Sequence, residues 1–132
     1  MKRVLLDTCV FSYVFKGDSR ALAYRPFLED VQPALCFVTV AELYRWALER
    51  RWSAKRIALL KHGIAQCETI VYDDELGWEW ARLMAARGRP MSSGDAWIAA
   101  CALRHSLPLV THNRSDFAHV SGLELISMSG EA

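Results

Sequence analysis

The chain has 132 residues, a length that fits one domain with its own hydrophobic core. Hydrophobic residues make up 52% and charged residues 23% of the sequence, which is typical of a globular protein and excludes a disordered chain. The net charge of +1 indicates no particular class of partner. No apolar run reaches the ~20 residues of a membrane span, and no signal-peptide core is visible, so we expect a cytoplasmic protein. We predict a single domain over 1–132, with a flexible tail at 127–132.

In chain order, the hydrophobic pattern alternates between strands and helices. It predicts a strand at 4–6, short helices at 9–16 and 20–31, a strand at 35–38, helices at 40–51 and 54–66, a strand at 68–72, a helix from the acidic stretch 73–75 to about 87, a helix at 94–106, and strands at 109–111 and 123–126. Helices between strands predict crossover connections, and therefore an α/β fold with a mostly parallel sheet of four or five strands. The strands are continuous apolar runs, as expected when both faces are covered.

The cysteines show no spacing typical of a metal site or a redox motif. They are far apart, without a C-x-x-C pair, and the histidines are not paired with them in a zinc pattern. Four cysteines are enough for disulfides, but their apolar surroundings favour buried free thiols in a reducing compartment. The four are Cys9, Cys36, Cys67 and Cys101.

Four acidic residues stand where the predicted elements end or begin. Asp7 follows the first strand, Glu42 follows the second, and Asp116 follows the fourth. Asp95 lies at the start of the apolar helix at 94–106. Ligands of open parallel sheets bind at the carboxyl ends of the strands. The four side chains are therefore candidates for a single site.

Each acid also has a purely structural interpretation, which the sequence leaves open. Two of them fit the capping box of a helix, in Thr39-x-x-Glu42 and in Ser92-x-x-Asp95. The other two, Asp7 and Asp116, fit a helix cap or a turn.

A shared site for four carboxylates predicts a divalent cation. Carboxylates in one place repel one another and resist joint ionisation. Mg²⁺ or Mn²⁺ removes this conflict because hard cations prefer carboxylate and water oxygens. Such an ion generates hydroxide near neutral pH and orients a phosphodiester for in-line attack. An acidic cluster without Cys or His ligands thus favours phosphoryl chemistry over redox or zinc chemistry.

Short motifs around these acids match a known family in order and spacing. They are Leu6-Asp7-Thr8, Thr39-x-x-Glu42-Leu43, Asp95-Ala96-Trp97-Ile98-Ala99-Ala100 and Thr111-x-Asn113-x-x-Asp116-Phe117, followed by Gly122-Leu123. Because the motifs span essentially the whole chain, the sequence resembles the PIN-domain ribonucleases, and within them the VapC-type toxins of type II toxin–antitoxin pairs. One departure is Gly94, where many relatives have Asn, but it removes no carboxylate.

The resemblance implies a fold, an activity and partners. The fold would be a three-layer α/β/α sandwich around the sheet, and the activity hydrolysis of RNA phosphodiester bonds by an endoribonuclease toxin that blocks translation or growth. One or two Mg²⁺ or Mn²⁺ ions would be held by Asp7, Asp95 and Asp116, with Glu42 as a ligand or an orienting group. Supporting roles would fall to Thr8, Thr111 and Asn113. The implied partners are RNA, a cognate VapB-like antitoxin and a second copy of the chain in a homodimer, without a membrane.

A basic stretch follows Glu42 along the chain. Between positions 45 and 61 there are six basic residues and one acid, Glu49. Phosphate contacts supply much of the non-specific affinity for nucleic acid, so this stretch is a candidate RNA surface. A solvated pair of helix faces, or contact with an acidic partner protein, would explain it equally well. The candidate RNA-binding residues are Arg45, Arg50, Arg51 and Lys55.

Other functions explain the four acids less well. A phosphatase of the haloacid-dehalogenase type needs a second aspartate two residues after the first, where this chain has Cys9. A phospho-accepting receiver domain needs an acidic pair near the start and a late lysine, which are not evident. The remaining alternatives are a catalytically silent PIN-like binding module and a housekeeping nuclease without an antitoxin.

Overall fold

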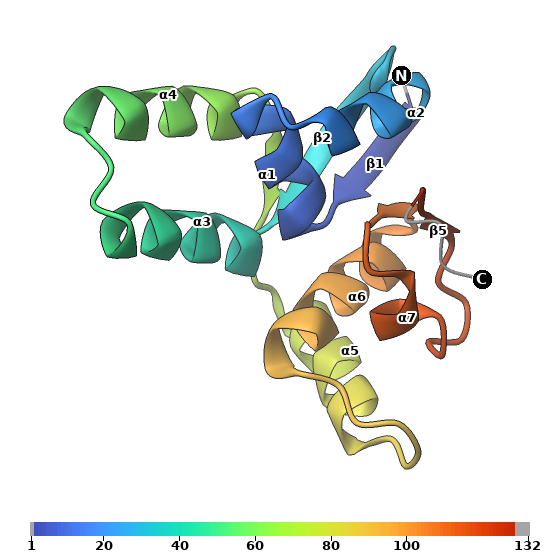
Figure 1. The fold of residues 1–132 in the computed structure, drawn as a ribbon. Helices are drawn as coiled ribbons and strands as arrows, with labels where there is room; N and C mark the ends of the chain where they lie inside the picture. Colours follow the sequence, from blue (N-terminus) through green and yellow to red (C-terminus); the bar gives the residue numbers. More distant parts are fainter. Residues whose placement is uncertain (1, 129–132) are drawn as a thin grey trace.

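A parallel sheet forms the centre of the molecule in the computed structural model, which describes residues 2–128 (Figure 1). Its five strands lie in the order β3-β2-β1-β4-β5, and all neighbouring pairs are parallel. The strands are β1 (Lys2–Leu6), β2 (Val31–Cys36), β3 (Glu68–Ile70), β4 (Leu109–Val110) and β5 (Leu125–Ile126). The predicted α/β fold with a parallel sheet is thus confirmed, with β1 as the central strand.

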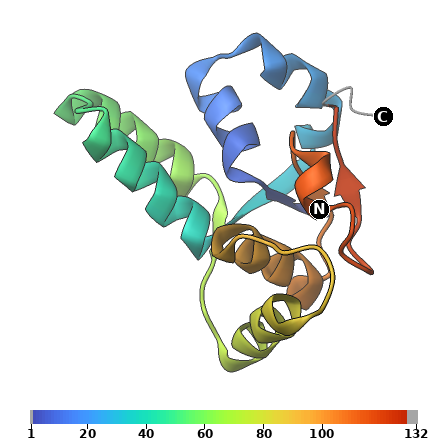
Figure 2. The same ribbon diagram turned by 60° about the horizontal axis from the view of Figure 1, so that its bottom comes forward.

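Helices connect the strands and form the outer layers of the sandwich. They are α1 (Thr8–Lys16), the 3₁₀-helix η1 (Ser19–Tyr24), α2 (Arg25–Leu28), α3 (Phe37–Glu49), α4 (Ala54–Ala65), α5 (Asp74–Ala85), α6 (Ser93–His105) and α7 (Arg114–Phe117). Helices α3 and α4 extend away from the sheet in the same direction (Figures 1 and 2). We refer to this pair, with its connecting turn, as the α3–α4 arm.

Successive strand residues point to opposite faces, which gives the protein two hydrophobic cores. Leu5 and Leu109 lie in the core that α5, α6 and α7 cover. Val4, Leu35 and Val110 lie in the core that α1, η1, α3 and α4 cover. These strand residues are almost completely buried, which explains why each strand is a continuous apolar run. The predicted three-layer sandwich is confirmed.

The structure corrects the predicted helix at 20–31. This segment is a 3₁₀-helix followed by the single turn α2, because Pro26 has no N–H to continue a helix and instead suits its start. Asp30 then adopts the left-handed conformation, with φ 58°, and turns the chain into β2. A second short helix, α7, follows β4 where the sequence predicted none.

Strand β2 begins four residues earlier than predicted, because Pro33 hid its first half. Proline is rare in central strands since it cannot donate to the ladder. Here Val31 to Pro33 pair only with β1, and β3 joins from Ala34 onwards. Pro33 therefore occupies a stretch whose outer edge is free, where its missing N–H costs little.

Three further predictions concern the membrane, the cysteines and the C-terminal tail. Within residues 2–128, no helix is long and apolar enough to cross a membrane. All four cysteines are free thiols, as predicted, and the buried Sγ atoms of Cys36 and Cys101 lie 3.2 Å apart. Most of the predicted tail, 129–132, lies outside the described residues, whereas the Met128 N–H donates to the Tyr24 hydroxyl at 3.0 Å.

Candidate metal centre

Asp7 stands at the carboxyl end of the central strand and caps the next helix. Its backbone is extended, and its Oδ1 accepts a hydrogen bond from the Thr8 N–H at 2.7 Å. Its Oδ2 accepts from the Thr111 hydroxyl at 2.6 Å and from the Cys9 thiol at 3.4 Å. Only 6% of Asp7 is exposed. The carboxylate is therefore held by both β1 and β4 and cannot rotate away.

Glu42 is brought to the site by a hydroxyl contact between two helices. The Thr8 hydroxyl lies 3.0 Å from that of Thr39, which joins the start of α1 to the first turn of α3. Glu42 follows less than one turn later on α3. The capping-box interpretation of Thr39 is wrong, because α3 begins at Phe37 and Thr39 lies buried inside it.

Asp95 lies in the first turn of α6, opposite Glu42. The Ser92 hydroxyl accepts from the Asp95 N–H at 3.1 Å, so the predicted cap of this helix is present. The Ser92 side chain also hydrogen-bonds to the Asp95 carboxylate, which opposes the rise in its pKa. A Cβ placed on Gly94 would lie 3.7 Å from the Glu42 Oε1, so the start of α6 faces Glu42 closely.

Asp116 is held by the turn after β4. The Asn113 N–H donates to the Thr111 hydroxyl at 3.0 Å, and the Asn113 carbonyl accepts from the Asp116 N–H at 3.0 Å. Asp116 itself lies in α7, the single helical turn that follows Asn113. Arg89 approaches from the loop before α6, with its guanidinium 3.9 Å from the Asp116 carboxylate and a hydrogen bond to the Ser115 carbonyl.

The four acids act on one another electrostatically. Burial raises the pKa of Asp7, Glu42 and Asp95, and neighbouring carboxylates raise each of them further. Asp116 raises the pKa of Asp7, while both Asp7 and Asp116 raise that of Asp95. Asp7 and Asp95 raise the pKa of Glu42. The structure thus brings all four predicted acids together at one edge of the sheet.

The residues of this cluster fit a hard divalent cation. The acids supply oxygen donors, and the nearby Cys9 thiol is no competitor because burial and Asp7 raise its pKa to about 12. Among residues 2–128, no three His, Cys, Asp or Glu side chains are arranged to hold a metal ion directly. Mg²⁺ does not require this, since one or two carboxylates commonly bind it while it keeps several waters. A divalent charge would also relieve the repulsion that raises the pKa values.

The family of the chain follows from a comparison with known proteins. A model of the PIN domain matches residues 4–123. The chain belongs to the PIN domain family.

Its relatives within the family are VapC ribonucleases. Ribonuclease VapC5 of Mycobacterium tuberculosis is 36% identical over 124 residues, which cover 89% of this chain and 87% of the relative. Ribonuclease VapC1 of Haemophilus influenzae strain R2866 is 30% identical over 129 residues, covering 91% and 93%. The crystal structure of VapBC-5 from M. tuberculosis, a member of the VapBC family of toxin–antitoxin systems, superposes with a TM-score of 0.69 at 31% identity and covers 97% of this chain and 100% of that chain.

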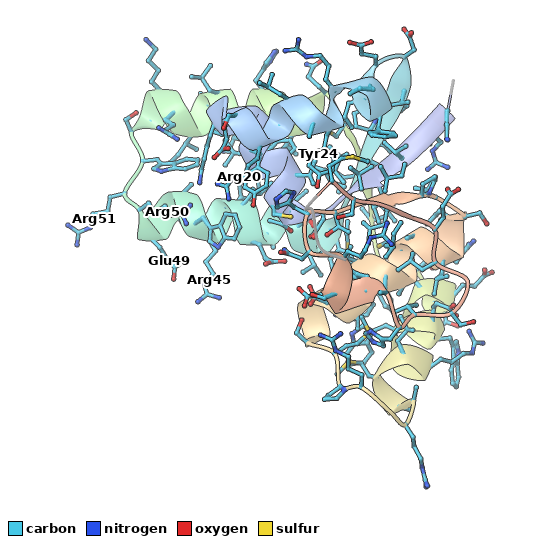
Figure 3. All side chains as sticks on the ribbon, turned by 45° about the vertical axis from the view of Figure 1, so that its right-hand side comes forward. Arg20, Tyr24, Arg45, Glu49, Arg50 and Arg51 are labelled. Atoms are coloured by element: carbon cyan, nitrogen blue, oxygen red, sulfur yellow. The ribbon has the colours of Figure 1, made fainter. Side chains whose placement is uncertain are left out.

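In this PIN domain the candidate RNA-binding residues lie on the α3–α4 arm, where Figure 3 labels Arg45, Arg50 and Arg51. Arg45 forms an ion pair with Glu49 at 3.2 Å, and the Arg50 guanidinium lies 5.1 Å from the centre of the Trp46 ring. Arg51 occupies the turn between the helices, with φ 53°, and Lys55 lies in the first turn of α4. Arg45 follows Glu42 by one turn of α3, and its charge opposes the rise in the Glu42 pKa, so this end of the candidate surface borders the acidic cluster.

Two residues next to the acids, Arg89 and Cys9, are not predicted by the sequence as part of the site. Arg89 lies just beyond the predicted end of a helix at about 87, and no pattern in the sequence shows that its loop folds back to Asp116. Cys9 is predicted from the sequence only as a buried thiol and as evidence against a phosphatase, although its spacing from Asp7 places it on the first turn of α1.

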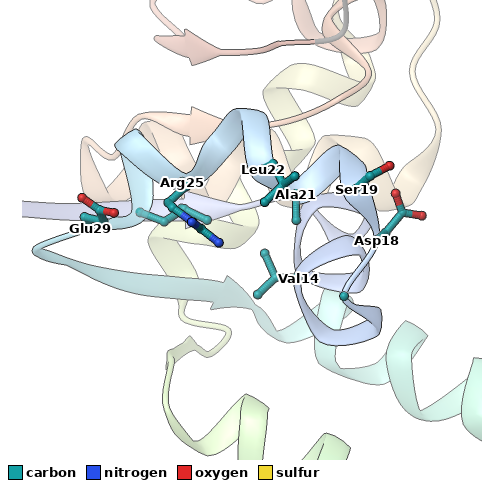
Figure 4. A pocket seen from close by; sticks show the side chains of 9 residues that line it. Val14, Asp18, Ser19, Ala21, Leu22, Arg25 and Glu29 are labelled. Carbon is teal, nitrogen blue, oxygen red and sulfur yellow. The ribbon is translucent and has the colours of Figure 1, made fainter.

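A pocket of about 570 Å³ between α1, η1 and α2 contains none of the four acids (Figure 4). The site is therefore identified by its chemistry and not by a cavity.

Proposed function

We propose that this PIN domain is a divalent-metal-dependent endoribonuclease and the toxin of a toxin–antitoxin pair. The observation that carries the proposal is the cluster of Asp7, Glu42, Asp95 and Asp116, in which burial and neighbouring carboxylates raise the pKa values of Asp7, Glu42 and Asp95. The names of the VapC relatives support the RNA substrate. A cytoplasmic location would follow from that substrate.

In this proposal the four acids hold the metal ions, and neighbouring residues keep Asp7 and Asp116 in place. Asp7, Asp95 and Asp116 would bind one or two Mg²⁺ or Mn²⁺ ions, and Glu42 would bind or orient from α3. When bound, such an ion lowers the pKa of a coordinated water and stabilises negative charge on the phosphate. Thr8 and Thr111 keep the Asp7 carboxylate in place, and Asn113 holds the backbone of Asp116. These fixed positions would keep the scissile phosphate aligned for in-line attack.

The same proposal includes three partners, namely RNA, an antitoxin and a second copy of the chain. The α3–α4 arm would bind the RNA backbone through Arg45, Arg50, Arg51 and Lys55. A cognate antitoxin would bind and inhibit the chain, as the similarity to VapBC-5 suggests. A homodimer would cover some of the large apolar side chains that are exposed in the single chain, among them Leu48, Val71 and Trp78, which are 62–72% exposed.

The test of the proposed activity is cleavage of RNA by the purified chain, free of any partner. We expect cleavage of total RNA with Mg²⁺ or Mn²⁺, and none after EDTA or in the Asp7→Asn variant. The matched control is Asp73→Asn, because Asp73 also caps a helix, at the start of α5, but lies outside the cluster. Equal cleavage by wild type and Asp7→Asn would contradict the mechanism. No cleavage by any variant would favour the silent binding module.

A further inference from the structure

The Tyr24 hydroxyl joins three parts of the chain inside the protein. Tyr24 is fully buried at the end of η1 (Figure 3). Its oxygen lies 3.2 Å from the Thr111 carbonyl oxygen, 2.6 Å from the His112 Nδ1 and 3.0 Å from the Met128 backbone nitrogen. All three partners are more than 80 residues away in sequence, at separations of 87, 88 and 104. This contact therefore links η1, the turn after β4 and the C-terminal segment.

The Tyr24 hydroxyl takes part in a cluster of hydrogen bonds. A tyrosine hydroxyl has one hydrogen to donate and two lone pairs that accept. The Met128 N–H can only donate, so it fills one lone pair. The Ser127 side chain supplies a further hydrogen bond from the same segment. The hydroxyl hydrogen goes to the Thr111 carbonyl or to the His112 Nδ1, according to the tautomer of His112.

Loss of the hydroxyl would leave buried polar groups without this partner. The Met128 N–H, the Thr111 carbonyl and the His112 Nδ1 would each lose one contact. Unsatisfied polar groups in a protein interior are destabilising. The hydroxyl therefore holds the turn after β4 and the C-terminal segment in their observed positions.

The turn held by Tyr24 is the one that supports two of the four acids. Thr111 donates its side-chain hydroxyl to the Asp7 carboxylate and accepts from the Asn113 N–H with the same oxygen. Asn113 in turn accepts from the Asp116 N–H. A shift of the backbone at 111–112 would therefore move both Asp7 and Asp116. The His112 ring has little freedom, since its edge also contacts the rings of Tyr13 and Tyr24, at 5.4 and 5.7 Å.

We propose that Tyr24 is a positioning residue for the acidic cluster. Its hydroxyl holds the 111–113 turn and the His112 ring, and through Thr111 it sets the geometry of Asp7 and Asp116 towards the metal ion. The C-terminal segment takes part through Met128. The inference rests on the proposed function, because the positioned groups are its metal ligands.

The deciding variant is Tyr24→Phe, which keeps the buried ring and removes only the hydroxyl. Loss of an outer partner of a metal ligand typically costs about 10- to 100-fold in metal affinity or activity. We expect a loss of kcat of this order with little change in KM, and weaker binding of Mn²⁺ measured by titration without RNA. The ¹⁵N shifts of His112 should report a different tautomer balance in Tyr24→Phe than in wild type, because the Nδ1 loses its contact with the hydroxyl.

The matched control is Tyr13→Phe. The Tyr13 ring also contacts His112, but its hydroxyl accepts from Arg20 at 3.1 Å and does not reach the turn. This variant should keep the wild-type kcat, Mn²⁺ affinity and His112 tautomer. A folded Tyr24→Phe with all three properties unchanged would overturn the proposal.

A second pair of variants covers the case in which Tyr24→Phe does not fold. In His112→Asn the side-chain amide can replace the Nδ1 as hydrogen-bond partner of the hydroxyl, whereas His112→Leu has no polar group. We expect His112→Asn to bind Mn²⁺ more tightly than His112→Leu, and equal affinities would contradict a role for this contact. If wild type cleaves no RNA, the proposed function fails, while the tautomer and Mn²⁺ measurements still decide the role of Tyr24.

Discussion

At the scale of single residues, Asp7 combines a structural and a chemical task. It ends the central strand, caps α1 through the Thr8 N–H and lies among three other acids. Only one carboxylate oxygen is used for the cap, while the second faces Thr111 and Cys9. The two tasks can therefore be separated by substitution. An asparagine keeps the capping oxygen and removes the charge.

We expect Asp7→Asn to abolish activity without destabilising the fold. Cleavage should fall by more than about 100-fold, since the loss of a ligand exceeds that of an outer partner. Without metal, the melting temperature should stay the same or rise by about 3–6 °C, because the variant no longer buries a charge or repels Asp116, and roughly 1 kcal/mol is worth this much in a domain of this size. Thermal melts with and without Mg²⁺ provide the measurement. A clear fall in the metal-free melting temperature would count against a crowded acidic cluster.

The raised pKa values predict how stability depends on pH. The folded state binds protons at Asp7, Glu42 and Asp95 more tightly than the unfolded state does. Their contribution to the free energy of unfolding should therefore increase as pH falls from neutral through the raised pKa values, and level off below the unfolded values near 4. Asp18, whose pKa is lowered to about 2, titrates below this window.

Urea unfolding of the metal-free protein between pH 7 and pH 5 tests this dependence. Wild type should gain stability relative to Asp7→Asn as pH falls. With Mg²⁺ the trend should reverse, because protons compete with the ion for the carboxylates. A metal-free wild type that loses stability relative to the variant over this range would contradict the pKa directions.

The four acids were predictable from the sequence, whereas most of their supports were not. Each acid sits at the boundary of an apolar segment, and that position is visible in the chain itself. Thr39 looked like a helix cap because its spacing to Glu42 is correct, and only the early start of α3 at Phe37 shows otherwise. Tyr24 reaches the site from η1 and Arg89 from the loop before α6, so no local pattern reveals them.

At the scale of elements, the strongly periodic segments were predicted and the weakly periodic ones were not. Helices α4 and α6 match their predicted ranges within one residue, because long apolar patterns and caps define both. The sequence pattern does not predict the first four residues of β2, because Pro33 lies among them. It does not predict α7, because four residues cannot show a helical period. Short elements are fixed by tertiary contacts, such as the pairing of β2 with β1.

Two helical glycines should respond differently to substitution by alanine. A Cβ on Gly63 in α4 would meet Phe11 at an ordinary 3.5 Å, so Gly63→Ala should stabilise the protein by about 0.5–1 kcal/mol through helix propensity. A Cβ on Gly77 in α5 would lie 2.6 Å from the Tyr72 hydroxyl and push the Tyr72 ring off Trp97. The gain in the free energy of unfolding should therefore be roughly 1 kcal/mol smaller for Gly77→Ala than for Gly63→Ala. Urea unfolding of both variants gives this difference, and equal gains would refute the contact.

At the scale of the whole molecule, the near-zero net charge conceals a separation of charge. Acids gather at the carboxyl edge of the sheet, while unpaired cations lie on the α3–α4 arm, among them Arg51 and Lys55. Neither the +1 total nor the local pattern predicts this distribution, which depends on the direction in which the arm projects. The α3–α4 arm would hold the proposed RNA, and the acidic cluster would cut it.

Charge reversal on the arm should weaken RNA binding and leave the chemistry unchanged. We expect Arg51→Glu with Lys55→Glu to raise KM several-fold at low salt, with kcat the same, and the difference from wild type to shrink as NaCl increases. Lys2→Glu is the control, because Lys2 lies at the opposite end of β1 from Asp7. A fall in kcat with constant KM, or an equal effect of Lys2→Glu, would exclude the arm as the RNA surface.

The way Asp7 is held also bears on how such a protein escapes its own activity. Aspartate and asparagine codons differ by a single base, and the cap on α1 needs only the oxygen that both side chains share. One mutation can therefore yield a folded chain that is inert towards RNA yet keeps its outer surface. Such a chain would still occupy an inhibitor, and in a cell that also carries the active form it would act as a decoy that sets the active copy free.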